Sequence, residues 1–211
     1  MNPVKSFFLL FFLLLFGISH AQTFTAVKDA ASVQKQITEA SKAISTIQCD
    51  FTQEKSMSML AEKAQSKGKF YFMRENKVRL EYQHPVKNLV VMNNGKMLIS
   101  DEKKTTQTDT HRSKVFQQLN NIIIGSINGS LFNGSDFAPS FYENGTQLKV
   151  ELKPVSKMLK NFLSTVVIVL EKKDFTASRI EMHEPSGDNT ILHFSAKQIN
   201  GKVAEELFTV K

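Results

Sequence analysis

Residues 68–85 read GKFYFMRENKVRLEYQHP, and residues 89–99 read LVVMNNGKMLI. Both stretches are rich in aromatic and branched residues, and large apolar side chains often alternate along them, which is typical of strands with one buried face. The pair Asn94-Gly95 tolerates the positive φ angles that a tight hairpin turn requires. The two stretches therefore predict neighbouring antiparallel strands.

The same pattern continues on both sides of these stretches. Further Asn-Gly pairs occur at 144–145 and 200–201. No long helical crossover separates the segments, which favours an antiparallel meander over a parallel α/β sheet. The predicted strands cover residues 47–54, 68–73, 77–83, 88–92, 96–100, 140–143, 147–153, 164–172, 177–184, 190–196 and 205–210.

Two segments have a helical period instead. Between Thr25 and Ile44, apolar residues recur at steps of three and four, which predicts an amphipathic helix that covers a neighbouring surface. Residues 112–127 have the same period and end in a stretch rich in Asn, Gly and Ser, which predicts a second helix. A helical turn is expected at residues 156–162. About eleven strands are too many for a small open sheet with one bare face. We therefore expect a mainly β fold with a strongly curved antiparallel sheet, whose concave apolar face the helices cover.

The first 21 residues have the three parts of a signal peptide. Lys5 precedes an unbroken apolar run over residues 7–16, and Ser19 and Ala21 are small residues of the kind that a signal peptidase prefers. The run is shorter than the roughly 20 residues of a membrane-spanning helix, which favours cleavage over an uncleaved anchor. The only cysteine, Cys49, does not follow this run directly. We therefore expect no lipid anchor.

The remaining chain, residues 22–211, has the length of a single domain with a sizeable core. It holds 26 lysines and arginines against 20 acids, so it is clearly basic. An exported chain rarely meets nucleic acid, and no cluster of cations interleaved with aromatic residues occurs, so we expect no nucleic-acid partner. Attraction to anionic lipid or to an acidic protein face fits this charge, and so does a merely soluble surface.

No group of residues predicts catalysis or metal binding. The four histidines after the signal peptide stand far apart, without the spacing of metal ligands. Cys49 lies in a strand-like run, which is typical of a buried small hydrophobe. The glycines at 125 and 129 indicate the end of a helix rather than a nucleophile elbow. We expect no cofactor, no metal and no enzymatic activity.

A longer stretch of the sequence resembles a known family. It joins FTQEK at residues 51–55 to the two stretches quoted above. This stretch resembles the periplasmic outer-membrane lipoprotein carrier family, called LolA-like, in the order and spacing of five features. These are an F-x-Q motif, a strand that begins G-x-hydrophobic, an R-P-N turn, an R-W-E-Y-like strand that ends at Pro, and a hairpin with (D/N)-G.

The resemblance implies an unclosed β-barrel with a helical lid over an apolar cavity. Proteins of this family take the acyl chains of lipoproteins released by an inner-membrane transporter and deliver them to an acceptor at the outer membrane. We therefore expect a monomeric periplasmic carrier of acylated lipoproteins. The alternatives are a carrier of the same fold for another lipid-like or acylated product, and an extracytoplasmic hydrolase.

The resemblance also implies roles for single residues. Arg74 stands where the turn arginine of the family hydrogen-bonds to the lid and holds the empty cavity closed. Glu75 replaces the usual Pro of this turn, and Leu80 replaces the usual Trp of the next strand. Only one face of each strand can line a cavity. The candidates for the cavity wall are Phe51, Phe70, Phe72, Leu80, Tyr82, Leu89 and Val91. The candidates for the lid are Val33 and Ile37 in the first helix, and Leu119, Ile122 and Ile123 in the second.

Overall fold

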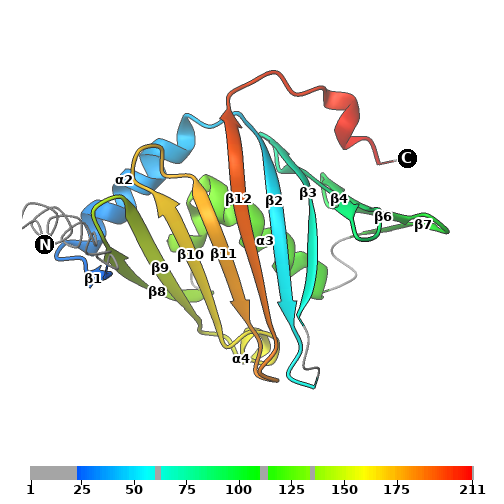
Figure 1. Cartoon of the computed structure of the whole chain (residues 1–211). Coiled ribbons are helices and arrows are strands. Elements are labelled where there is room, and N and C mark those ends of the chain that lie inside the picture. The colour runs from blue at the N-terminus through cyan, green and yellow to red at the C-terminus, as the bar shows by residue number, and fades with distance from the viewer. Residues whose placement is uncertain (1–22, 60–62, 110–113, 134–135, 211) are drawn as a thin grey trace, which may run out of the picture.

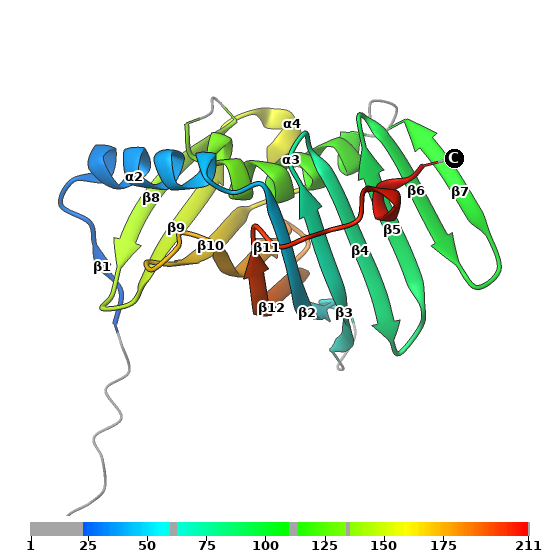
Figure 2. The same cartoon turned by 90° about the horizontal axis from the view of Figure 1, so that it is seen from above.

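A computed structural model describes residues 23–59, 63–109, 114–133 and 136–210. Figures 1 and 2 show one strongly curved sheet with helices on its concave side. The predicted signal peptide, residues 1–21, lies outside the described residues. The predicted fold class is confirmed: the protein is mainly β, with an unclosed antiparallel sheet.

Twelve strands form the sheet within the described part of the chain. They are β1 (Thr25–Ala26), β2 (Thr46–Ser56), β3 (Ala64–Met73), β4 (Lys77–His84), β5 (Asn88–Asn93), β6 (Lys96–Asp101), β7 (Thr105–Asp109), β8 (Phe137–Glu143), β9 (Gln147–Pro154), β10 (Thr165–Glu171), β11 (Ala177–His183) and β12 (Asn189–Ile199). Their order in space is β1-β8-β9-β10-β11-β12-β2-β3-β4-β5-β6-β7. All paired neighbours are antiparallel.

The helices lie on the concave side of this sheet (Figure 2). Asp29 begins the first of them, because its side chain accepts a hydrogen bond from Ser32 N at 2.9 Å. No helix in the described ranges has the length and apolar character that crossing a membrane requires. These helices are α2 (Ala30–Lys42), α3 (Lys114–Asn128) and α4 (Lys157–Lys160), with the short 3₁₀ helix η3 (Ser130–Phe132). A second 3₁₀ helix, η4 (Glu205–Phe208), lies on the convex side (Figure 2).

Alternation along the strands places apolar side chains on the concave face. In the middle of the sheet, Ile47 pairs with Phe72, and Phe72 pairs with Val78 on the next strand. On the other half of the sheet, Val150 pairs with Ile168 in the same way. All five side chains are buried. The core therefore lies between the concave face and the helices that cover it, since side chains of period two share one face of a sheet.

Two elements near the sheet edges differ from the prediction. The first helix begins at Ala30 rather than near Thr25, because Thr25 and Ala26 pair with β8 as a short edge strand. The sequence does not predict strand β7 (TTQTD), because this strand has no apolar residue that could reveal a period of two.

The predicted last strand, residues 205–210, is wrong: this segment is a strap across the convex face. It contains η4, and Phe208 is completely buried. Arg79 Nη1 donates to Leu207 O at 3.1 Å, and Asn93 Nδ2 donates to Phe208 O at 3.0 Å. Side chains of β4 and β5 therefore hold the strap where a backbone ladder was expected.

Candidate functional site

A pocket of about 390 Å³ lies between the concave face of the sheet and α3. This volume is within the range of about 300 to 1,000 Å³ that is typical of ligand sites. Apolar side chains dominate the wall, and the polar residues are few. The lining residues are Gln53, Lys55, Leu80, Tyr82, Val90, Met92, Met97, Ile99, Ile122, Ile123, Phe162, Leu163, Met182, Glu184, Thr190 and Leu192.

Strands β4, β5 and β6 form one wall of this pocket. Leu80 and Tyr82 of β4, two of the candidates, belong to it. On β5 the lining residues are Val90 and Met92, because Val90 is the cross-strand partner of Leu80. The alternation of side chains then turns Leu89 and Val91, the two candidates on this strand, to the convex face.

Val91 shows why burial alone does not identify the wall. It is 1% exposed, as little as many residues of the core. Its cross-strand partner is Arg79, whose guanidinium binds the carbonyl of Leu207 in the strap. Asn93, on the same face as Val91, binds the carbonyl of Phe208. The strap therefore covers Val91 on the convex side of the sheet.

The three phenylalanine candidates lie on the concave face but do not line the pocket under α3. The ring of Phe51 meets the ring of Tyr82 edge to face, with centroids 5.0 Å apart. Gly68 is the cross-strand neighbour of both residues, and a Cβ added to it would stand 1.9 Å from Glu81 O. Phe72 belongs to the packed core. Phe70 lines a separate small cavity.

This small cavity, of about 30 Å³, shares one wall residue with the pocket under α3, because Ile123 lines both. Cys49 also lines it, and burial raises the pKa of this thiol to about 12. Lys197 enters the same cavity, where its Nζ donates to Thr176 Oγ1 at 2.7 Å, and burial lowers its pKa. A thiol with so high a pKa stays protonated at neutral pH and is a poor nucleophile.

Helix α3 forms the roof of the pocket through Ile122 and Ile123, two of the lid candidates. Leu119 also belongs to α3, but its side chain lies outside the described part of the structure. The candidates on α2 have another place: Ile37 is buried in the core, and Val33 packs against the core, away from the pocket wall. Of the two helices, α3 therefore covers the pocket directly.

Helix α2 is nevertheless tied to the end of α3. Ser41 Oγ donates to Asn128 O at 2.9 Å, and Gln34 Nε2 donates to Phe132 O at 3.0 Å. Gly129 joins α3 to η3 with a φ of +76°, and a Cβ there would stand 3.3 Å from Thr38 Cα. Because α2 touches α3 this closely, a movement of one helix requires an adjustment of the other.

Arg74 binds the carboxyl end of α2 and the junction that follows it. Its Nε donates to Ile44 O at 3.0 Å, and its Nη2 donates to the carbonyls of Ser41 and Lys42. Its backbone N–H donates to Ser45 O at 2.8 Å. A cation at this position also complements the negative end of the helix dipole.

Asn200 binds the same junction from the other side. Its Nδ2 donates to Ala43 O at 2.8 Å, and its backbone N–H donates to Thr46 O at 2.9 Å. Its Oδ1 accepts from the backbone N–H of Ser45 at 2.7 Å and from the hydroxyl of Ser45 at 2.9 Å. Arg74 and Asn200 together thus bind all six carbonyls of residues 41–46. We call residues 41–46 the hinge, and Arg74 and Asn200 the hinge clamp.

The turn that carries Arg74 has a conformation that proline cannot adopt. Glu75 and Asn76 have φ angles of 69° and 62°, whereas proline is restricted to about −65°. The replacement of the usual Pro by Glu75 therefore accompanies a left-handed turn between β3 and β4.

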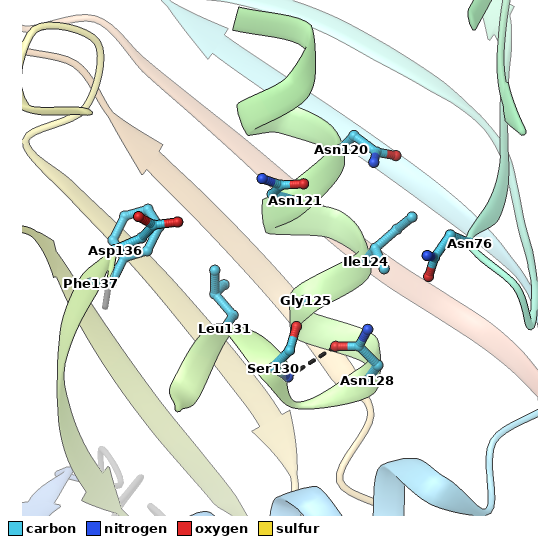
Figure 3. Close-up of a pocket in the computed structure, with 10 residues that line it drawn as sticks. All are labelled: Asn76, Asn120, Asn121, Ile124, Gly125, Asn128, Ser130, Leu131, Asp136 and Phe137. Carbon is cyan, nitrogen blue, oxygen red and sulfur yellow. Dashed lines mark hydrogen bonds between the residues drawn. The ribbon is translucent and has the colours of Figure 1, made fainter. Parts of the chain in front are cut away.

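A polar pocket of about 340 Å³ lies beside a different set of α3 residues (Figure 3). Asn120 and Asn121, which are consecutive residues of α3, both line it, and Asn128 Oδ1 accepts from Ser130 N at 2.9 Å. No lysine or arginine occurs among its described lining residues, so the pocket lacks the charge that an anionic head group requires.

In the described ranges no three His, Cys, Asp or Glu residues gather as metal ligands would.

A family model described as "Outer membrane lipoprotein carrier protein LolA" matches residues 42–211. A search of curated proteins finds no match. Solved structures with a similar fold include an uncharacterized conserved protein from Thermus thermophilus, with a TM-score of 0.50, 9% identity, and coverage of 87% of this chain and 95% of that chain. A LolA superfamily protein from Nitrosomonas europaea has a TM-score of 0.45 and 11% identity, with 84% and 97% covered. The Pseudomonas aeruginosa MucA/MucB complex has a TM-score of 0.49 and 12% identity, with coverage of 87% of this chain and 62% of that chain.

Proposed function

Because this chain belongs to the outer membrane lipoprotein carrier family LolA, we propose that it carries the acyl chains of lipoproteins through the periplasm. The observation that carries this proposal is the pocket of about 390 Å³ under α3. Its wall joins Leu80, Val90 and Met92 of the sheet to Ile122 and Ile123 of the helix. Such a wall offers an acyl chain an environment that excludes water on several sides.

The wall favours acyl chains for a simple reason. Each CH₂ group that leaves water for an apolar environment gains about 0.8 kcal/mol. Three methionines, Met92, Met97 and Met182, stand in the wall. Their unbranched side chains can change rotamer and fit chains of different length or shape. The pocket therefore supports a carrier that recognises acyl chains without chemistry on them.

Release requires that binding of the acyl chain can be weakened. Competition from the lid for the same surface weakens it. Ile122 and Ile123 lie against the same wall that a bound chain would contact. Cargo and lid therefore compete for one surface, and whatever stabilises the closed lid lowers the affinity for cargo. The hinge clamp stabilises the position of α2, and α2 is tied to α3 through Ser41 and Asn128.

The family and the predicted export signal support a route for the cargo. We propose that the signal peptide over residues 1–21 directs the chain to the periplasm and is cleaved there. The carrier then receives lipoproteins from a transporter of the inner membrane and passes them to an acceptor at the outer membrane. It needs neither a cofactor nor an enzymatic step.

Two neighbouring residues on β5 allow a direct test. Val90 lines the pocket, whereas Leu89 faces the convex side. The protein should form a one-to-one complex with a triacylated lipoprotein in native mass spectrometry. Val90→Phe should reduce the amount of complex about tenfold or more, because the ring displaces several buried CH₂ groups of the cargo. Leu89→Phe is the matched control and should leave the complex unchanged. Equal binding by the two variants would contradict the proposed site.

The alternative cargo, another lipid-like product, has its own test. Lipids that copurify with the protein from its native host can be extracted and identified. Acyl chains linked to a cysteine would support the lipoprotein cargo. A different acylated product would support the alternative cargo, bound in the same pocket.

A further inference from the structure

The two ends of the sheet carry different kinds of loop. Because neighbouring strands are antiparallel, the connections β2–β3, β4–β5, β6–β7, β9–β10 and β11–β12 all lie at one end, which we call the far end. The hinge clamp and the Asn-Gly turns lie at the opposite end. The five large apolar side chains that are exposed in the described ranges all belong to connections of the far end. They are Met59, Val86, Val155, Met158 and Phe162.

Three of these side chains lie in one short segment around α4. Val155, Met158 and Phe162 are 52%, 38% and 41% exposed. Val155 precedes the N-cap Ser156, Met158 lies within α4, and Phe162 follows the C-cap Asn161, so the three side chains surround one short helical turn. Leu159 and Leu163 point the other way and are buried in the core. The buried leucines therefore fix the turn on the protein, and the exposed side chains form an outward ridge, which we call the α4 ridge.

Lysines accompany the α4 ridge. Lys153, Lys157 and Lys160 are all exposed, and the sequence from 153 to 163 contains no acid. None of the three makes an ion pair within 4.0 Å with any residue that the structure describes. The ridge thus combines exposed apolar side chains with positive charge that the protein itself does not neutralise.

The pocket under α3 reaches this same end. Phe162 belongs both to the α4 ridge and to the pocket wall, and Leu163 follows it in the wall. Lys55, near the far end of β2, and Glu184, which directly follows β11, also line the pocket. An apolar path of one side chain therefore connects the exposed ridge to the pocket interior.

From these observations we infer that the far end docks on the surface of an anionic lipid bilayer, with the α4 ridge in the interface. The part of this inference that concerns transfer of acyl chains through Phe162 rests on the proposed function. The docking itself does not depend on it. The lysines would face lipid phosphates, and the apolar side chains would enter the boundary between head groups and acyl chains.

The composition of the ridge favours a bilayer over a protein partner. The buried centres of protein interfaces are depleted in lysine, because each ammonium group must lose its water there. Segments that lie in a lipid interface combine lysine with large apolar residues, since the long lysine side chain keeps its charge among the head groups. Three lysines around three apolar side chains match the second pattern.

Flotation with lipid vesicles tests the docking. The mature chain, residues 22–211, is mixed with vesicles of phosphatidylcholine, with or without added phosphatidylglycerol. We expect binding to the anionic vesicles, little binding to the neutral ones, and a loss of binding at high salt. Lys157→Gln with Lys160→Gln should weaken binding about tenfold or more, because each lysine near such a surface contributes several-fold to affinity.

The matched control for charge is Lys96→Gln with Lys202→Gln. These two lysines are exposed and lie away from the far end, and their loss changes the net charge equally. Met158→Ser with Phe162→Ser should also weaken binding, and circular dichroism checks that this variant is folded. The inference is overturned if the chain binds neither vesicle, which would leave a protein as the partner of the ridge, or if the two pairs of lysine variants bind equally.

A second readout separates this inference from the proposed function. Binding of a fluorescent fatty acid reports on the pocket, and it should persist in the variant with Lys157→Gln and Lys160→Gln. Normal uptake of the fatty acid without vesicle binding contradicts the docking alone. Vesicle binding without uptake of the fatty acid contradicts the carrier function alone.

Discussion

Six consecutive carbonyls, those of residues 41–46, each accept a hydrogen bond from one of two residues, Arg74 or Asn200. The family pattern points to Arg74, because its turn is part of the motif. It does not point to Asn200, which the sequence presents only as half of an Asn-Gly turn. The contact between Asn200 and the hinge joins residues that are about 155 positions apart in the chain. Local patterns carry no signal for such a contact.

Asn200→Ala should loosen the hinge and raise the affinity for a fluorescent fatty acid. The variant loses three hydrogen bonds of the side chain, each worth about 1 kcal/mol net. A closed state weakened by this amount competes less with the ligand, so affinity should rise about fivefold or more. Hydrogen exchange of the amides in α2 should become faster at the same time.

Asn144→Ala is the control for this prediction. Asn144 also belongs to an Asn-Gly turn, and its Oδ1 accepts from the backbone N–H groups of Thr146 and Gln147. It makes no contact with the hinge in the described structure. A similar change of affinity in both variants would show that Asn200 acts only through general stability.

Glu75→Pro should destabilise this protein even though proline is usual at this position in the family. The φ of 69° at Glu75 lies outside the range of proline. We expect a loss of roughly 3 kcal/mol in the free energy of unfolding, measured by denaturant titration. Glu75→Gly, which accepts the left-handed conformation without strain, should keep or slightly raise stability. A proline variant as stable as the original would contradict the described turn.

At the level of elements, the sequence alone does not predict which side chains of strand β5 face the pocket. Its residues Leu89, Val90, Val91 and Met92 are all apolar, so the period of two has no visible phase. The sheet buries both faces of this strand: the pocket side faces α3, and the convex side lies under the strap. Because a strand buried on both faces does not alternate, only the pairing register distinguishes wall from back.

The strap depends on an ion pair that should respond to pH. Lys77 Nζ lies 2.5 Å from Glu205 Oε1. The hydrogen bond from Lys77 lowers the pKa of Glu205 below its ordinary 4.5, and the same bond raises the pKa of Lys77 above 10.5. The pair therefore contributes stability between these values. It is lost as pH falls through the lowered pKa of Glu205, and as pH rises through the raised pKa of Lys77.

Limited proteolysis of the last ten residues measures this effect. Cleavage should become faster as the pH falls through the lowered pKa of Glu205, where its carboxylate gains a proton. Glu205→Gln should show the faster cleavage already at neutral pH. Glu206→Gln, next to it and without an ion pair among the described contacts, is the control. Unchanged cleavage in Glu205→Gln would show that the ion pair does not hold the strap.

At the scale of the whole molecule, the curved sheet and the helices on its concave side follow from the sequence. Turn pairs, apolar strands and two amphipathic segments are local features, and they add up to this architecture. The placement of the pocket does not follow in the same way. It depends on which half of the sheet α3 covers, and on contacts between loops that are distant in sequence.

Acyl chains are proposed to bind between β4–β6 and α3. The most direct measurement uses a fatty acid with a photoactivatable group at its tail, crosslinked to the protein and mapped by mass spectrometry of peptides. We predict labels on the pocket side, at Val90, Met92 and Ile122. Labels at Leu89 or Val91 on the convex side, or a uniform distribution over the surface, would contradict the claim.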